Sequence, residues 1–170
     1  DLTFAFSADF FNAFIQTGFK RNYYKKIELS DGDSISLSKS PLIYVDKNKV
    51  ARMKLAFTQK VTGLSALAVR NPVRVEIDLI LATKIDATKN TVALVVDDID
   101  MDTVKVESNN FIWPFKGTGV RMAKQHVEDA RKNMKGYVLS DELPVPTDLM
   151  GISLQLATTT FDANGYLLFH

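Results

Sequence analysis

Two long segments of alternating apolar and polar residues limit the folds open to this chain more than any other feature. Residues 73–83, VRVEIDLILAT, place apolar side chains at every second position and charged ones between them, until both faces become apolar. Residues 49–62 repeat the alternation. Side chains of a strand point to opposite faces with a period of two. Both segments exceed the usual strand of about 5–6 residues, so they predict a long, highly curved sheet with an apolar concave side.

Composition excludes several functional classes. The chain has 170 residues, of which 46% are hydrophobic and 24% are charged, and this predicts one globular domain over residues 1–170. A net charge of +1 gives no field that would attract nucleic acid. No run approaches the roughly 18 apolar residues of a membrane span. The absence of cysteine excludes disulfides, thiolate metal sites and a cysteine nucleophile.

The first half of the chain predicts a strand, a helix and a meander. A strand over residues 2–6 leads into a helix capped by Ser7. Turn residues at 86–90 join the strand beginning at Val73 to another that resumes at Val92, with an irregularity expected at its acidic cluster. Helical spacing assigns the first helix an inward stripe of Phe10, Phe11, Phe14, Ile15 and Phe19, and an outward set of Asn12, Gln16 and Lys20.

The second half predicts a helix and a closing hairpin. The helix should start near Thr118 or Gly119 and stop at Gly136. A strand over 152–156, a turn over 162–165 and a strand over 166–169 should follow. The order strand, helix, meander, helix, hairpin predicts an α+β fold: a long, curved antiparallel sheet around one long helix, with a shorter N-terminal helix. The stripe expected on the long helix is Ala123, Val127, Ala130 and Met134.

Three stretches of this sequence resemble the tubular lipid-binding superfamily, which includes bactericidal permeability-increasing protein. LTFAFSADFFNAFIQTGF looks like the strand that enters a helix through a Ser in those modules. VRVEIDLILATKIDATKNTVALVVDDIDMDTVKVE looks like their pair of long curved strands. VEDARKNMKGYVLSDELPVP with MGISLQLATTTFDANGYLLF looks like their long helix, Pro-containing turn and final hairpin. Small single-module bacterial envelope lipoproteins are nearest in size and order.

The resemblance implies that acyl chains lie between sheet and helix, and it implies no enzymatic activity. We therefore expect non-enzymatic binding of a lipid or another apolar ligand, with no catalytic residue, cofactor or metal. Burial would drive binding at about 25 cal/mol per Å² of apolar surface. The expected ligand-binding residues are Phe14, Met53, Leu55, Phe57, Ile77, Leu79, Trp113, Ala123, Val127 and Met134.

A basic, aromatic segment follows the first helix. Tyr beside Lys and Arg suits a membrane interface, where the ring lies in apolar surroundings and the hydroxyl in water. A solvated loop is the alternative. The residues that would touch a membrane surface are Arg21, Tyr23, Tyr24, Lys25 and Lys26.

Polar clusters have both a functional and a structural interpretation. Residues 97–102, DDIDMD, could bind Ca²⁺, but they lack the Gly and distal Glu of an EF-hand loop, so a solvated strand face is the alternative. Glu76 and Asp78 share a strand face, as a carboxylate pair or as part of a cross-strand charge ladder. His126 lies beside an apolar helical stripe, where packing in the core competes with a role as a ligand. Gly117 to Gly119 form either an anion site or a hinge.

Residues 111–115, FIWPF, form an apolar cluster that either lines the entrance of a cavity or closes the end of the core. The sequence begins at Asp1, which suggests removal of a signal peptide or a lipid-anchored segment and a periplasmic, envelope-anchored or secreted location. A homo-oligomer is compatible with the sequence. Two other functions stay open: an interaction module of an envelope or secretion assembly with a self-filled core, and an enzyme with carboxylates around Glu76, Asp78 and Asp98.

Overall fold

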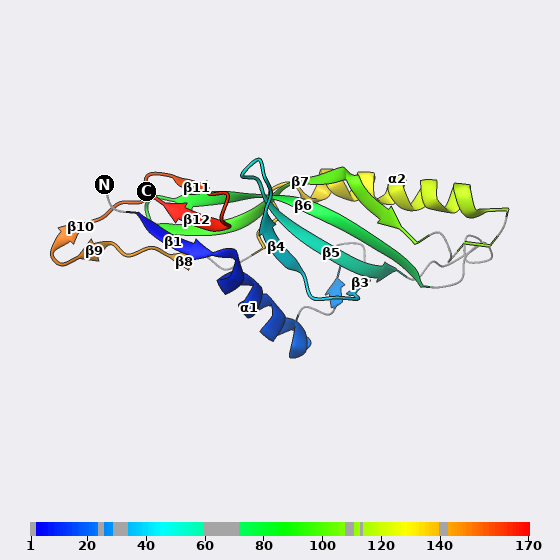
Figure 1. The fold of residues 1–170 in the computed structure, drawn as a ribbon, viewed down its shortest axis with the longest axis horizontal. Coiled ribbons are helices and arrows are strands. Elements are labelled where there is room, and N and C mark those ends of the chain that lie inside the picture. Colours follow the sequence, from blue (N-terminus) through cyan, green and yellow to red (C-terminus); the bar gives the residue numbers. More distant parts are fainter. Residues whose placement is uncertain are drawn as a thin grey trace.

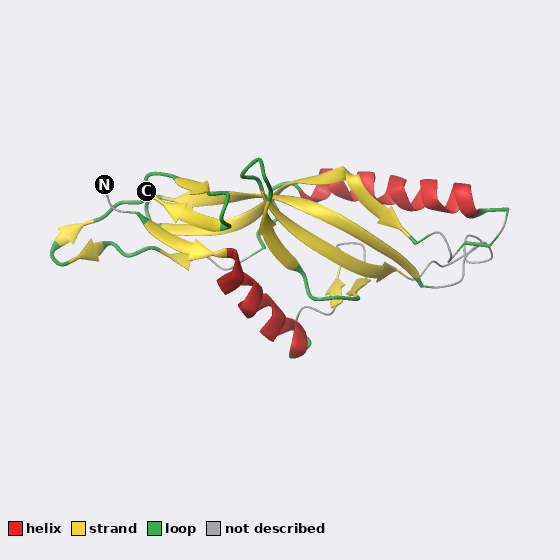
Figure 2. Ribbon diagram, viewed as in Figure 1, coloured by secondary structure: helices red, strands yellow, loops and turns green. Residues whose placement is uncertain are grey.

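The computed structural model shows an elongated α+β protein with a mostly antiparallel β-sheet and two helices in its described part (Figure 1). One helix runs alongside the sheet, and the other projects from the side of the molecule (Figure 2). The structure describes residues 3–23, 26–28, 34–59, 72–107, 111–112, 114–139 and 143–170.

The largest sheet contains, in the described part of the chain, β2 (Lys26–Glu28), β3 (Ser34–Leu37), β4 (Leu42–Val45), β5 (Ala51–Gln59), β6 (Val73–Asp86), β7 (Thr91–Val106) and β8 (Leu143–Pro144). The order is β2-β3-β5-β6-β7-β8, and β4 also pairs with β5. All of these pairings are antiparallel. Because β6 occupies one edge of β5, strands β3 and β4 share the other.

The register of β5 and β6 confirms the predicted alternation. Met53 lies opposite Leu79 and Leu55 opposite Ile77, so the apolar faces of both strands coincide. All four side chains are buried. The charged residues between them project to the other face, because neighbouring strand residues alternate. The pairing therefore gives the sheet one apolar and one polar face.

The hairpin of β6 and β7 is the longest pairing in the described residues. Its turn covers residues 87–90, as predicted, and Asn90 adopts a φ of 51° there. The register shifts between Glu76 and Asp78 and again between Ile80 and Leu81. On β7 these shifts fall within residues 96–105, which confirms the irregularity expected at the acidic cluster.

A smaller sheet closes one end of the molecule. Its order is β1-β12-β11, and β9 pairs separately with β10. The sequence predicted a strand over 152–156, but only its first two residues are extended, and the partner of β12 comes later. Leu156 is buried outside any strand because its N–H donates to Asn90 Oδ1 at 2.9 Å. The bounds are β1 Phe4–Ser7, β9 Asp148–Leu149, β10 Ile152–Ser153, β11 Thr159–Phe161 and β12 Tyr166–Phe169.

The two helices are α1 (Ala8–Lys20) and α2 (Lys116–Met134). Ser7 caps α1 as predicted, accepting a hydrogen bond from Phe10 N at 3.2 Å. Helix α2 begins two residues before the expected start and is followed by Gly136, whose φ is +81°. A Cβ at Gly119 would overlap the Phe111 ring, so this glycine makes room for packing inside the helix rather than forming a hinge before it.

The described residues share one hydrophobic core. Its largest part comes from the inward faces of β5, β6 and β7, and Leu79, Val96 and Ile99 are almost completely enclosed. Leu167 and Phe169 of β12 extend the same cluster toward the smaller sheet. The core is therefore continuous along the length of the molecule.

Helix α1 packs Phe11, Ile15 and Phe19 against the core, as predicted, but three other positions differ from the prediction. Asn12 is buried, although the sequence placed it outward, whereas Phe10 and Phe14 are exposed. Asn12 Nδ2 donates to Ile43 O, and Ile43 N donates to Asn12 Oδ1, both at 2.7 Å. Ile43 lies on the edge of β4 that β5 does not cover, so the side-chain amide satisfies a sheet edge. The hydrogen bonds to Ile43 therefore turn Asn12 inward, and Phe10 and Phe14 of the predicted apolar stripe face outward instead.

We expect Asn12→Ala to lower the free energy of unfolding by about 2–4 kcal/mol, because it leaves two buried backbone groups of Ile43 without partners. Urea denaturation measures this loss. Gln16→Ala, on the exposed side of the same helix, is the matched control and should change stability by less than about 0.5 kcal/mol. Equal effects of the two substitutions would contradict the role given to Asn12.

Candidate functional site

The strand residues expected to bind a ligand lie together in one buried layer. Met53, Leu55 and Phe57 of β5 and Ile77 and Leu79 of β6 are all less than 9% exposed. They occupy the same face, in adjacent register. The layer is apolar and continuous, and it belongs to the hydrophobic core.

Helix α2 adds little to this layer. It lies along β7, and Val127 is its one buried residue. Ala123 and Met134 are half-buried on the same side, as predicted. His126 is exposed and thus not packed in the core. Val127 packs against the core together with the partly buried Val120 and Met134 of the same helix.

Two predicted binding residues are not placed in that layer. Phe14 is 66% exposed on α1, and Trp113 lies outside the described residues. The residues near Trp113 in the sequence differ in burial: Phe111 is buried, whereas Ile112 and Phe115 are exposed.

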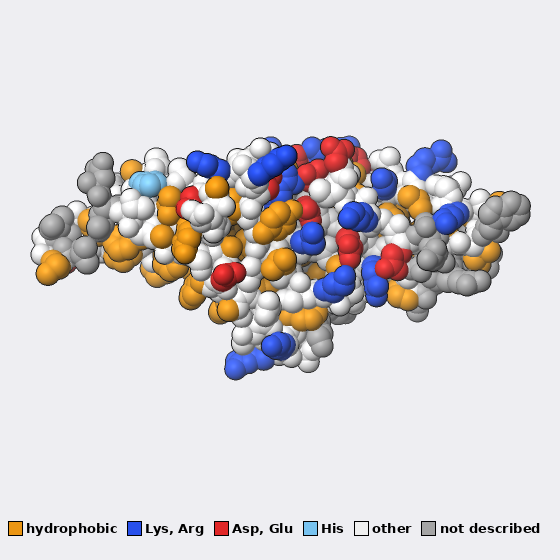
Figure 3. Space-filling model, viewed as in Figure 1, with side chains coloured by type: hydrophobic (Ala, Val, Ile, Leu, Met, Phe, Trp, Pro, Cys, Tyr) orange, Lys and Arg blue, Asp and Glu red, His pale blue; other side chains and the backbone are white. Residues whose placement is uncertain are grey.

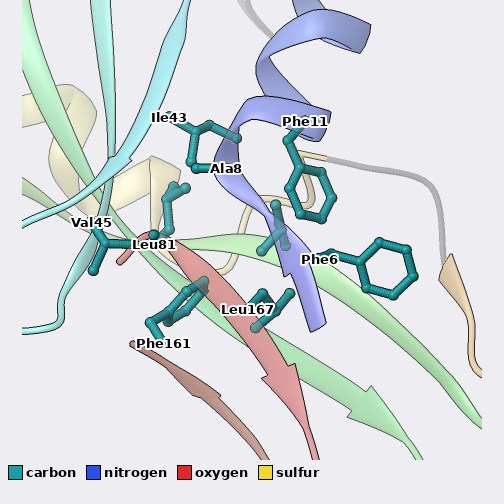
Figure 4. A pocket seen from close by; sticks show the side chains of 10 residues that line it. Phe6, Ala8, Phe11, Ile43, Val45, Leu81, Phe161 and Leu167 are labelled. Carbon is teal, nitrogen blue, oxygen red and sulfur yellow. The ribbon is translucent and has the colours of Figure 1, made fainter. Parts of the chain in front are cut away.

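A small, partly open apolar pocket lies between α1, β4 and the hairpin of β11 and β12 (Figure 4). Its volume is about 10 Å³, roughly the space of one water molecule. Typical ligand sites measure about 300–1,000 Å³. None of the predicted binding residues line it; its lining is Phe6, Ala8, Phe11, Ile43, Val45, Leu81, Leu94, Phe161, Gly165 and Leu167.

Three phenylalanines form an exposed surface on α1 and the preceding strand, which we term the α1 aromatic surface: Phe6, Phe10 and Phe14. They are 36%, 56% and 66% exposed. The sequence missed this surface because helical spacing placed Phe10 and Phe14 in the core. The available signal was Asn12, a polar residue within a run of apolar ones.

Ring contacts anchor the α1 aromatic surface to the core. The Phe6 ring centroid lies 5.3 Å from that of buried Phe169, in an edge-on arrangement, and 5.9 Å from that of Phe10. Phe10 in turn lies 5.7 Å from Phe11. Such pairs contribute about 0.5–1.5 kcal/mol each beyond area burial. Phe6 and Phe10 are therefore held in place by neighbouring rings.

Basic side chains adjoin this surface at the end of α1. Lys20, Arg21 and Tyr23 are exposed, and no ion pair joins Lys20 or Arg21 to another described residue. Figure 3 shows Lys and Arg side chains at the tip where α1 ends and hydrophobic side chains along the neighbouring edge. Of the predicted membrane-contact residues, Tyr24 and Lys25 lie outside the described part of the chain, and Lys26 opens β2.

The carboxylates considered for catalysis are tied into a polar network on the other face of the sheet. Asp78 Oδ2 accepts a hydrogen bond from the Tyr44 hydroxyl at 2.6 Å. Burial, and then this bond, raise the pKa of Tyr44 to about 12. Arg52 joins Asp100 at 2.5 Å and Asp46 at 2.8 Å.

Glu76 and Asp78 have different partners, because Glu76 forms an ion pair with Lys39 at 3.1 Å. The Arg52–Asp100 and Tyr44–Asp78 contacts cross between strands, as in the predicted charge ladder, whereas Lys39 and Asp46 lie outside strands, and Asp78 is buried rather than solvated.

Asp98 connects the sheet to α2. Its carboxylate accepts two hydrogen bonds from Arg131, at 2.5 and 2.6 Å. The Arg131 guanidinium lowers the pKa of Asp98 to about 2. An open, polar hollow of about 330 Å³ adjoins this pair, lined also by Asp100 and Asp102. The described residues contain no group of three His, Cys, Asp or Glu side chains placed to hold a metal ion.

Acid should weaken the attachment of α2. The pKa of Asp98 is below its usual 3.8 in the folded protein, so its stabilising effect is present above about pH 4 and lost toward about pH 2. The effect is modest, because both side chains are about a third exposed. Urea denaturation across this range should show a smaller loss for Asp98→Asn than for the unsubstituted protein. Asp102→Asn is the control; an equal response in Asp98→Asn would contradict the assignment.

No helix among the described residues combines the length and apolarity needed to cross a membrane. No protein-family model, curated protein or solved structure matches this chain. The resemblance to the tubular lipid-binding superfamily therefore stays a prediction.

Proposed function

We propose that this protein is a non-enzymatic docking module that binds an apolar partner through the α1 aromatic surface. One observation carries the proposal: Phe6, Phe10 and Phe14 are displayed outward, while the apolar pocket beside them in the described residues has a volume of only about 10 Å³. This corresponds to the interaction module among the functions open from the sequence.

The exposure of these rings argues for a partner. Complete burial of a Phe side chain contributes about 1.5–3 kcal/mol, and exposed apolar clusters commonly mark interaction sites. Two of the rings follow one another at i and i+4 on α1, so they lie on one side of the helix. Because Phe6 and Phe10 are held by ring contacts, the surface is preorganised and little side-chain freedom is lost on binding.

A dye that fluoresces on apolar surfaces, anilinonaphthalene sulfonate, tests the docking surface. The folded protein should enhance its fluorescence, and Phe10→Ser with Phe14→Ser should remove most of the enhancement. Phe14→Ser alone should change the free energy of unfolding by less than about 0.5 kcal/mol, since an exposed ring contributes little to folding.

Phe115→Ser is the matched control, since Phe115 is 50% exposed but lies at the start of α2. Equal loss of dye fluorescence in this variant, or no loss in the α1 variants, would contradict the proposal.

A second candidate function is the uptake of a lipid or another apolar ligand between the sheet and α2. The limited burial of α2, in which Val127 is the one buried residue, supports this candidate. Outward movement of the helix would uncover the part of the apolar core beside β7 that Val127 covers. A curved sheet around a long helix, as in the tubular lipid-binding superfamily, is the arrangement that this candidate requires.

Leu79→Trp tests the second candidate, because Leu79 is completely enclosed in the predicted lining. If a ligand occupies the layer, the larger side chain should block uptake of a fluorescent fatty acid by delipidated protein while the fold persists. If the layer is only core, the substitution should cost about 1–3 kcal/mol of stability, and the unsubstituted protein should show no saturable uptake. Saturable uptake that Leu79→Trp leaves unchanged would exclude this lining.

A further inference from the structure

We infer that the partner of the α1 aromatic surface is the anionic surface of a lipid bilayer, with α1 lying in the interface. This inference rests on the proposed docking function and adds the chemistry of the partner. It uses the exposed rings, the basic residues at the end of α1 and the projection of α1 from the body.

The helix has the distribution of side chains that an interfacial helix needs. Phe10, Phe14 and Thr17 follow at i, i+4 and i+7 on one side, and Arg21 comes four residues later. The opposite side, with Asn12, is fixed to β4. The aromatic side can therefore enter a bilayer without detaching α1 from the protein.

Charge favours an anionic surface over a neutral one. Lys20 and Arg21 are exposed and make no ion pair with any described residue, whereas Arg52 and Arg131 are neutralised by carboxylates elsewhere in the protein. Long basic side chains can extend from an apolar surface to keep their charge in water. Tyr23, which is 71% exposed, adds a ring with a polar end beside them.

The shape of the molecule permits the approach. Helix α1 projects from the side of the elongated body and ends away from it (Figure 1). A flat surface can therefore meet the end of α1 before it meets the sheet. Binding by an interfacial helix depends on buried apolar area and on attraction to anionic lipids, and the two contributions can be removed separately here.

Flotation of the full chain with vesicles tests the inference. One set contains phosphatidylcholine alone, and the other an equimolar mixture of phosphatidylcholine and phosphatidylserine. The protein should bind the mixed vesicles more tightly, and added salt should weaken that binding. Phe10→Ser with Phe14→Ser should weaken binding roughly tenfold or more. Lys20→Gln and Arg21→Gln should each weaken it about fivefold, on the anionic vesicles only.

Matched controls separate a specific surface from general stickiness. Phe115→Ser, and Lys124→Gln with Lys132→Gln on exposed positions of α2, should leave the binding unchanged. Equal losses in these variants, or no binding to the mixed vesicles, would overturn the inference.

The same variants distinguish failure of the lipid inference from failure of the docking function. Dye fluorescence that depends on Phe10 and Phe14, without vesicle binding, would overturn the lipid partner and leave the docking function intact. Self-association that disappears in the double Phe variant, measured by sedimentation velocity, would assign the surface to a second copy of the chain and also overturn the lipid partner. If neither dye fluorescence nor vesicle binding depends on Phe10 and Phe14, both the docking function and the lipid partner are overturned.

Discussion

Two hydrogen bonds between the side chain of Asn12 and the backbone of Ile43 decide how α1 meets the rest of the protein. A free strand edge needs partners for its N–H and C=O groups, and an amide supplies one donor and one acceptor in matching positions. Once Asn12 faces β4, the helical period places Phe10 and Phe14 outside. The exposed aromatic surface is thus a geometric consequence of how the sheet edge is satisfied.

The long pairing of β5, β6 and β7 supplies the platform for this arrangement. Its apolar face forms the core, and its polar face carries Tyr44, Arg52 and their carboxylate partners. These carboxylates already accept hydrogen bonds from neighbouring side chains, so they contribute to the structure of the sheet. This division explains why the sheet offers a continuous core but no cluster of free acidic groups in the described residues from which catalysis or metal binding could be argued.

Sequence periodicity predicted the parts of the fold that depend only on residues close together in the chain. The strand alternation from Val73 and the Ser7 cap are confirmed, since each depends on neighbouring residues alone. Apolar spacing placed Phe11, Ile15 and Phe19 of α1 toward the core correctly, but the burial of Asn12 could not be read from it, because that depends on Ile43, 31 residues away. The turn over 162–165 and the closing strand are confirmed, but the strand predicted over 152–156 is present only at Ile152–Ser153, and Leu156 N–H instead donates to the distant Asn90. Of the candidate site, the buried strand layer was predicted, and the exposed rings were not.

The two helices differ in what holds them, and this difference orders the functional candidates. Helix α1 is fixed by the buried amide of Asn12, and ring contacts hold Phe6 and Phe10. Helix α2 is held by buried Val127, by the partly buried Val120 and Met134 that pack against the core, and by the Arg131–Asp98 ion pair. An aromatic surface that is already exposed suits docking without rearrangement, whereas uptake beneath α2 requires these contacts to break. Docking through α1 needs no change from the structure as it stands, and that is the physical reason it precedes uptake as the proposed function.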